Sequence, residues 1–148
     1  TLFPYTTLFR SRTGSSDLYW LKHIDSRIEE SFATLLAAED LTRRGWQVLN
    51  TISDAGSITV AEVDSAMGPF LSPAEPTMRP YADEFVKRGW ATLAGSDVIT
   101  MTGDGRLAHR RVSSQVAGLR DRMSECLSPE EYELLMNLLQ RVAAHLDA

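Results

Sequence analysis

The feature that most constrains this sequence is a short amphipathic segment followed directly by two β-type runs. Apolar residues at positions 78, 81, 82, 85 and 86 have the spacing i, i+3, i+4, i+7 and i+8, which predicts a helix with one buried face. Gly89 ends this segment. Residues 90–93 and 98–101 are rich in β-forming residues, and four turn residues, Ala-Gly-Ser-Asp, separate them. This pattern predicts a helix that leads into a β-hairpin.

Three further helices are predicted before this segment. Apolar residues at three- and four-residue spacing predict a first helix over residues 17–38. Thr42 is a candidate N-cap of a second helix that ends near Gly56, and Thr59 is a candidate N-cap of a short third helix. A brief strand is expected between them at 57–59. Three short helices followed by a hairpin is the order of a winged helix-turn-helix.

Two longer helices are predicted after the hairpin, with Thr102 as the N-cap of the first and a capping box at Ser128 for the second. The predicted inward residues are Leu107, Val112, Val116, Leu119, Met123 and Leu127 in the first, and Tyr132, Leu135, Met136, Leu139, Val142 and Leu146 in the second. A monomer of 148 residues has little with which to cover these stripes. Large exposed apolar stripes usually mark interfaces, so a homodimer is expected.

Composition sets wide bounds on function. The chain is 43% hydrophobic and has a net charge of −5, but residues 40–111 hold eight Lys/Arg against nine Asp/Glu and are nearly neutral. This nearly neutral charge is compatible with nucleic-acid binding but is not evidence for it. No apolar run is long enough for a membrane span, no signal-peptide pattern is present, and Cys126 is the single cysteine. We therefore expect a cytoplasmic protein without metal, cofactor or membrane contact.

Catalysis is not expected either. The three histidines are far apart in sequence, and no nucleophile–base pair or metal-ligand cluster accompanies them. Cys126 lies beside Glu125 near a predicted helix end, a setting that does not favour a reactive thiolate, so a redox-sensor role is the weaker interpretation.

The first residues stand apart from this pattern. Residues 1–11, TLFPYTTLFRS, resemble a translated sequencing adapter, and a native flexible arm is the alternative. We expect residues 1–16 to form a disordered, non-native arm and residues 17–148 to form one domain.

Four segments from residue 17 onward are informative together, namely LTRRGWQVL at 41–49, TVAEV at 59–63, the stretch 77–90 that ends VKRGW, and ITMTGDGR at 99–106. In these segments the chain resembles the MarR family of transcription regulators. No single motif is specific, but their ordered combination is. The resemblance implies a mainly α fold with a small β-hairpin wing.

The resemblance also implies a function. Residues 40–101 would form the DNA-binding winged helix-turn-helix, and residues 17–38 and 103–148 would form the dimerisation helices. The expected partners are a second copy of the chain, double-stranded DNA with a palindromic operator, and a small aromatic or phenolic effector. The expected role is that of a ligand-responsive repressor. The runner-up is a winged-helix protein-interaction module that has lost strong DNA binding.

Candidate DNA-contacting residues follow from the predicted recognition helix and wing. Arg79, near the start of the helix, is the best candidate for pairing with a guanine edge. Lys87 and Arg88 are interpreted as phosphate contacts or ordinary surface charges. Thr77 and Ser72 either contact DNA or only cap local turns. The full predicted set is Ser72, Thr77, Arg79, Pro80, Lys87, Arg88 and Ser96.

Some residues depart from the family pattern. The predicted wing has no basic residue. Pro80 is expected either to kink the recognition helix or to mark a later start of that helix. Asp83 and Glu84 lie on the helix face that phosphates should approach. These departures favour the interaction-module alternative. The predicted effector pocket consists of Tyr19, Trp20, His23 and Trp46, with ordinary core packing as the alternative.

Overall fold

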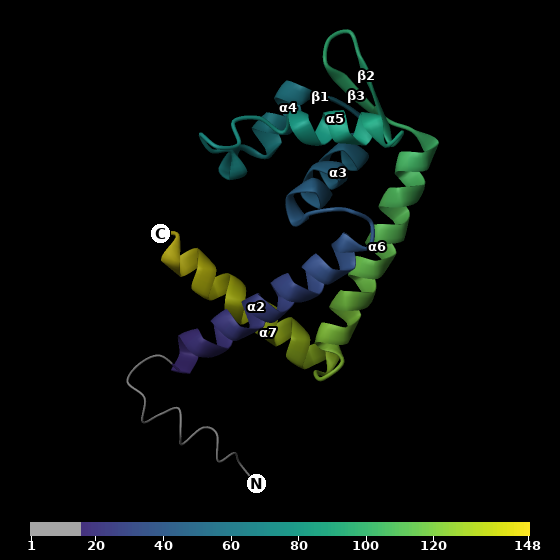
Figure 1. The fold of residues 1–148 in the computed structure, drawn as a ribbon. Helices are drawn as coiled ribbons and strands as arrows, with labels where there is room; N and C mark the ends of the chain where they lie inside the picture. Colours follow the sequence, from purple (N-terminus) through teal and green to yellow (C-terminus); the bar gives the residue numbers. More distant parts are fainter. Residues whose placement is uncertain (1–15) are drawn as a thin grey trace.

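The structure, a computed structural model, describes residues 16–148, with side chains from Tyr19 onward. The predicted N-terminal arm thus lies outside the described residues except for Ser16. The elements, labelled as in Figure 1, are α2 (Ser16–Ala37), α3 (Arg43–Ala55), β1 (Ser57–Thr59), α4 (Val60–Ala66), the 3-10 turn η1 (Gly68–Phe70), α5 (Arg79–Lys87), β2 (Ala91–Ala94), β3 (Val98–Met101), α6 (Gly103–Ser124) and α7 (Pro129–Leu146). The predicted fold class, mainly α with a small antiparallel sheet, is confirmed.

Helices α3, α4 and α5 gather with the sheet at one end of the molecule (Figure 1). Helix α3 lies at the centre of this part, and its residues Val48, Leu49 and Ile52 are fully buried. Around them pack Val63, Met78, Ala82, Phe85, Ile99, Ala108 and Val112, each almost completely buried. Val86 is 38% exposed, so the predicted apolar face of α5 is narrower than its spacing suggests.

Side chains at the predicted N-cap positions cap the first turns of α3, α4 and α7. The Thr42 hydroxyl accepts from the Gly45 N–H at the start of α3. Thr59 and Glu62 form a reciprocal capping box at the start of α4, and Ser128 and Glu131 form another at α7. These interactions satisfy N–H groups that have no partner within the helix, and they explain why the boundaries were readable from sequence.

The sheet consists of three antiparallel strands in the order β1-β3-β2, with Thr59 opposite Val98 and Leu93 opposite Ile99. Strands β2 and β3 form the predicted wing hairpin. Its turn ends at Asp97, which has a left-handed backbone with φ of 57°. The Asp97 carbonyl accepts from the Val60 N–H at 3.0 Å, so the wing turn is joined to the start of α4.

Helix α6 begins in close contact with the backbone before β2. The Trp90 carbonyl accepts from the Thr102 N–H at 2.9 Å, and Gly105 lies directly against the same carbonyl. This contact turns Gly105, Ala108 and Val112 toward the core, because residues three and four apart share a helix face. The prediction that Leu107 faces inward is therefore wrong, and its side chain is 49% exposed.

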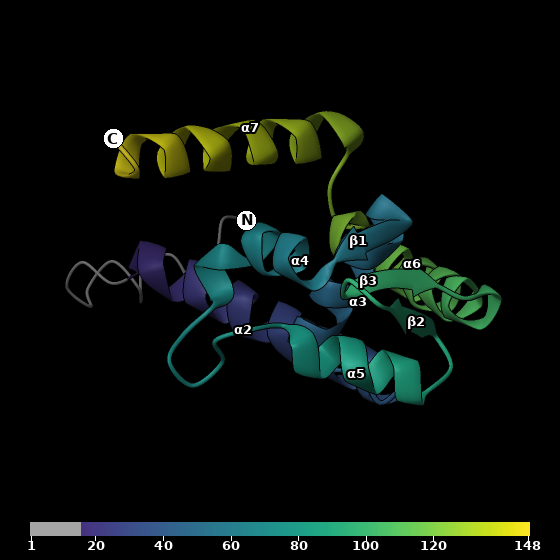
Figure 2. The ribbon, with the colours of Figure 1, turned by 90° about the horizontal axis from the view of Figure 1, so that it is seen from above.

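The helices outside the winged part are poorly covered by the chain itself. Helix α7 has no buried residue and runs apart from the rest of the molecule (Figure 2). Its residues predicted to face inward are all exposed, with values from 36% for Met136 to 76% for Leu146. Leu21 and Ile24 of α2 are about half exposed as well, at 52% and 51%.

His109 joins α6 to α3. Its Nε2 atom is 2.7 Å from Asn50 Oδ1, and its ring stacks on Trp46 with 5.1 Å between centroids. Burial lowers the pKa of His109 below its ordinary value, and the charge of Asp54 opposes this shift. The protonated form is thus disfavoured in the folded chain.

This shift predicts a pH-dependent stability. A group with a lowered folded pKa stabilises the fold above its unfolded pKa of about 6.5 and loses that contribution as the pH falls through the folded value. We expect the free energy of unfolding to decrease from pH 7.5 to pH 5.5, and to decrease less in His109→Gln. Urea unfolding of both proteins measures this difference, and an equal decrease in both would contradict the role of His109.

Candidate nucleic-acid interface

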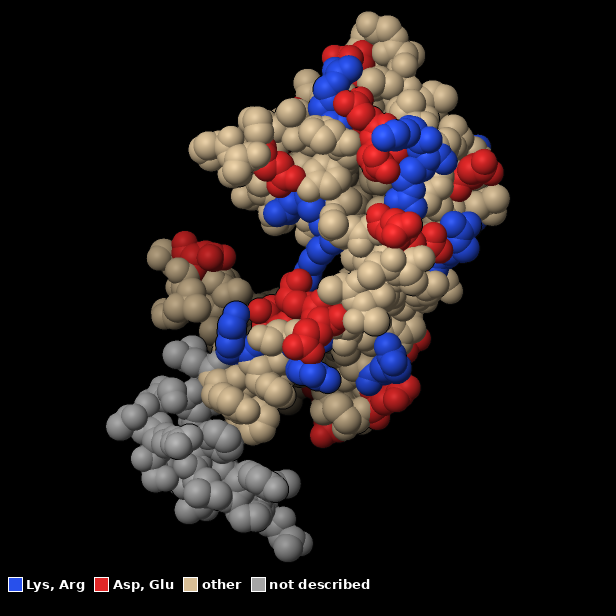
Figure 3. Space-filling model, in the orientation of Figure 1, with Lys and Arg blue, Asp and Glu red and all other residues tan. Residues whose placement is uncertain are grey.

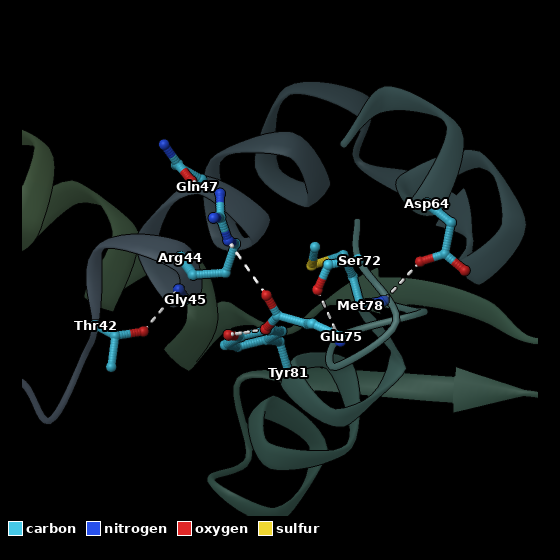
Figure 4. A network of polar contacts seen from close by, with 9 residues as sticks. All are labelled: Thr42, Arg44, Gly45, Gln47, Asp64, Ser72, Glu75, Met78 and Tyr81. Atoms are coloured by element: carbon cyan, nitrogen blue, oxygen red, sulfur yellow. Dashed lines mark hydrogen bonds and ion pairs between the residues drawn. The ribbon is translucent and has the colours of Figure 1, made fainter. Parts of the chain in front are cut away.

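The start of α5 is fixed by the carboxylate of Asp64 on α4. The Met78 N–H donates to Asp64 Oδ1 at 2.6 Å (Figure 4). The Thr77 hydroxyl donates to Asp64 Oδ2 at 2.8 Å. The Thr77 hydroxyl in turn accepts from the Arg79 N–H at 3.2 Å. The helix therefore begins at Arg79, later than the sequence match to 77–90 suggested, and Pro80 occupies its first turn without breaking a helical hydrogen bond.

A second network holds the loop before α5 against α3 (Figure 4). Glu75 accepts a hydrogen bond from the Tyr81 hydroxyl and forms an ion pair with Arg44 at 3.6 Å. Burial and the hydrogen bond to Glu75 raise the pKa of Tyr81 to about 12, so this hydroxyl remains a donor at neutral pH. The Ser72 hydroxyl accepts from the Glu75 N–H at 3.1 Å. Sequence reasoning missed Asp64 and Glu75, because both act on residues that are distant along the chain or in another element.

Arg79 is half exposed at the start of α5 and lies between two carboxylates. Its Nη1 atom is 2.9 Å from Asp97 Oδ1 in the wing turn, and its Nε atom is 3.9 Å from Asp83 Oδ1 one helical turn later. The structure thus brings together the predicted base-reading arginine and the wing. The acidic partner in the wing was not predicted, because the sequence does not show that the turn folds back toward α5.

Three other predicted residues are exposed near this position. Pro80 and Lys87 lie on α5, and Ser96 lies in the wing turn. Among the described residues, neither Lys87 nor Ser96 has a hydrogen-bonding or ionic partner. These side chains are therefore available to an external ligand.

Arg88 has a different setting. Its guanidinium donates to the Glu39 carbonyl at 2.6 Å and to the Asp40 carbonyl at 3.3 Å, and it lies 3.7 Å from the ring centroid of Trp90. Glu39 also accepts two hydrogen bonds from Arg111 of α6, at 3.0 and 3.2 Å. Arg88 thus ties the end of α5 to the turn between α2 and α3, and this turn is tied to α6.

Charge on the winged part is mixed. In the face shown in Figure 3, Lys and Arg are interspersed with Asp and Glu over the upper part of the molecule. Within residues 16–148, no three His, Cys, Asp or Glu side chains are placed to hold a metal ion. None of the described helices has the length and apolarity needed to cross a bilayer.

The four residues of the predicted effector pocket do not come together in the chain. Trp46 is buried at 7% exposure and stacks on His109, whereas Tyr19, Trp20 and His23 form an exposed aromatic cluster near the start of α2. A separate open groove of about 680 Å³ lies between α2 and α6. Its lining consists of Arg27, Glu30, Ser31, Thr34, Leu35, Gln115, Gly118, Leu119 and Arg122.

The arrangement defines a winged helix-turn-helix with long helices added at both ends. Comparison with solved structures finds a similar fold in MarR regulators. The reduced form of MarR from E. coli is 19% identical, with a TM-score of 0.67 over 96% of this chain and 95% of that chain. A Mycobacterium tuberculosis MarR-family protein in complex with DNA is 18% identical, with a TM-score of 0.68 over 84% and 94%.

A third similar structure is the transcriptional repressor CouR bound to p-coumaroyl-CoA, which is 23% identical, with a TM-score of 0.65 over 90% of this chain and 97% of that chain. No protein-family profile matches the sequence, and no curated protein matches it. The chain therefore has the MarR fold, which confirms the architecture expected from the resemblance.

Proposed function

We propose that this chain is a homodimeric, sequence-specific DNA-binding transcription regulator that places α5 of each protomer in the major groove of a palindromic operator. The observation that carries this proposal is the construction of α5. Asp64 and the Glu75 network fix its start, its inner face is buried, and Arg79, Pro80 and Lys87 remain outside. A rigid helix whose first residues are exposed is the element that reads base edges in this class of fold.

The dimer is supported by the uncovered helices. Helix α7 exposes eight large apolar side chains, namely Tyr132, Leu134, Leu135, Met136, Leu138, Leu139, Val142 and Leu146. An apolar helix that has no buried residue against the described part of its own chain requires another partner, and a second copy offers the same α2 and α7 surfaces in a two-fold arrangement. The dimer is also what the resemblance to the MarR family implies.

Within this interface we assign the DNA contacts as follows. Arg79 reads a base edge, Lys87 neutralises a phosphate, and Pro80 and Ser96 pack along the backbone. Thr77 and Ser72 lie beside this surface, although their hydroxyls already cap the loop before α5. Arg88 contributes by fixing the end of α5, and it reaches a phosphate only if it leaves the Glu39 and Asp40 carbonyls.

We further propose that the protein is a cytoplasmic repressor and that a small aromatic acid controls its binding to DNA. The groove between α2 and α6 supports this extension, because Arg122 supplies positive charge beside the apolar side chains of Leu35 and Leu119, whereas Arg27 is paired with Glu30 at 2.8 Å. Regulation then requires that the ligand bind more tightly to one arrangement of the two α5 helices than to the other.

Replacement of Arg79 by alanine tests the proposed function. We expect Arg79→Ala to weaken binding to a selected palindrome by about 10- to 100-fold, which corresponds to one base-pairing arginine, while affinity for random DNA changes little. Fluorescence anisotropy with both DNAs at several salt concentrations gives the two affinities. Wild-type binding should fall steeply with salt.

Two outcomes would contradict this account. Equal losses on both DNAs would show that Arg79 serves only phosphates. A wild-type protein that binds no DNA at 50 mM salt would favour the interaction module, an alternative supported by the two carboxylates beside Arg79.

A further inference from the structure

The ion pair between Arg79 and Asp97 joins the two elements expected to contact DNA. Arg79 is the first residue of α5, and Asp97 is the residue immediately before β3 in the wing. The contact that joins them runs from Nη1 to Oδ1 at 2.9 Å. Among the described residues, the Nη2 atom of the same guanidinium makes no hydrogen bond, so it remains available to an outside acceptor.

The position of Asp97 is set by its backbone. Its φ of 57° and the hydrogen bond from the Val60 N–H to its carbonyl place the residue between the wing and α4. Its carboxylate is thus presented to Arg79 from a fixed turn.

The charges around Arg79 disfavour contacts with DNA phosphates but not contacts with base edges. One guanidinium with two neighbouring carboxylates, Asp83 and Asp97, carries a net charge of −1. A phosphate approaching this group is repelled by the acids, because like charges interact unfavourably. The O6 and N7 atoms of guanine are neutral acceptors, and they pair with an arginine edge that is already oriented.

We propose that Asp97 is a specificity-determining residue, which holds Arg79 toward a base edge and suppresses binding to DNA of unrelated sequence. This inference rests on the proposed function, since it concerns how the same surface distinguishes one DNA from another. Discrimination here comes partly from a repulsive element rather than from an added attraction. The wing would then act through its acidic turn, although it lacks a basic residue.

Asp97→Asn tests the proposal. Asparagine tolerates a left-handed backbone, so the turn should keep its conformation while the charge is lost. We expect affinity for a scrambled duplex to rise about fivefold, and affinity for the duplex selected by the wild type to rise less. The ratio of selected-duplex affinity to scrambled-duplex affinity should therefore fall about threefold or more. Asp121→Asn, at the far end of α6, removes the same charge and should leave this ratio unchanged.

A second comparison shows whether Asp97 acts through Arg79. In an Arg79→Ala background, Asp97→Asn should no longer lower the ratio, which a double-mutant cycle measures. The proposal is overturned if Asp97→Asn behaves like Asp121→Asn, or if it strengthens binding to the selected duplex as much as to the scrambled one. Absence of any DNA selected by the wild type would instead refute the proposed function, and this inference with it.

Discussion

Gly105→Ala is expected to destabilise the fold by about 3 kcal/mol, because the added methyl group would meet rigid backbone rather than a movable side chain. A Cβ atom at this position would lie 2.0 Å from the Trp90 carbonyl oxygen and 2.8 Å from the carbonyl carbon. The same carbonyl accepts from the Thr102 N–H, so α6 and the start of the wing cannot separate without losing the N-terminal contact of the helix. The wing and α5 would lose their common support.

Gly103→Ala is the matched control for this change. It lies two residues earlier in the same helix, and a Cβ atom there would meet nothing within 4 Å. Urea unfolding of the two variants at one protomer concentration gives the comparison, since dimerisation makes stability depend on concentration. If Gly105→Ala unfolded at the same urea concentration as Gly103→Ala, the close contact between α6 and Trp90 would be wrong.

Leu139→Glu is expected to abolish the dimer at micromolar concentration. Leu139 lies on the apolar side of α7, and in a two-fold interface the substitution would bury two unpaired carboxylates. An unpaired buried charge costs several kcal/mol, so we expect the dissociation constant of the dimer to rise by at least about 100-fold. Binding to a palindromic duplex should weaken together with the dimer.

Asn137→Glu provides the control on the same helix. It adds the same carboxylate about 200° around the helix from Leu139, on the polar side of α7. Sedimentation velocity should show a dimer for this variant and a monomer for Leu139→Glu. A wild-type protein that sediments as a monomer, or a Leu139→Glu variant that remains a dimer, would contradict the assignment of α7 to the interface.

Local signals explain what could be predicted from sequence. Thr42, Thr59 and Ser128 act within three residues of themselves, so their caps were visible as short motifs. The hairpin was likewise predicted from two β-rich runs and their turn. The position of α5 was predicted from its apolar spacing, although its first residue was not.

The remaining features depend on contacts between distant parts of the chain. The start of α5 at Arg79 follows from Asp64, which lies on another helix. The pairing of Arg79 with Asp97 requires the wing turn to return beside α5, which no short motif encodes. Leu107 was placed inward by periodicity, but the contact of Gly105 with Trp90 sets the rotation of α6 and turns Leu107 outward.

The central claim is that two copies of α5 read one duplex together. Selection of bound sequences from random DNA by the full chain tests this claim directly. The account predicts an inverted repeat whose half-site centres lie about one helical turn, or 10 base pairs, apart. Enrichment of a single unpaired half-site, or no enrichment at low salt, would contradict it.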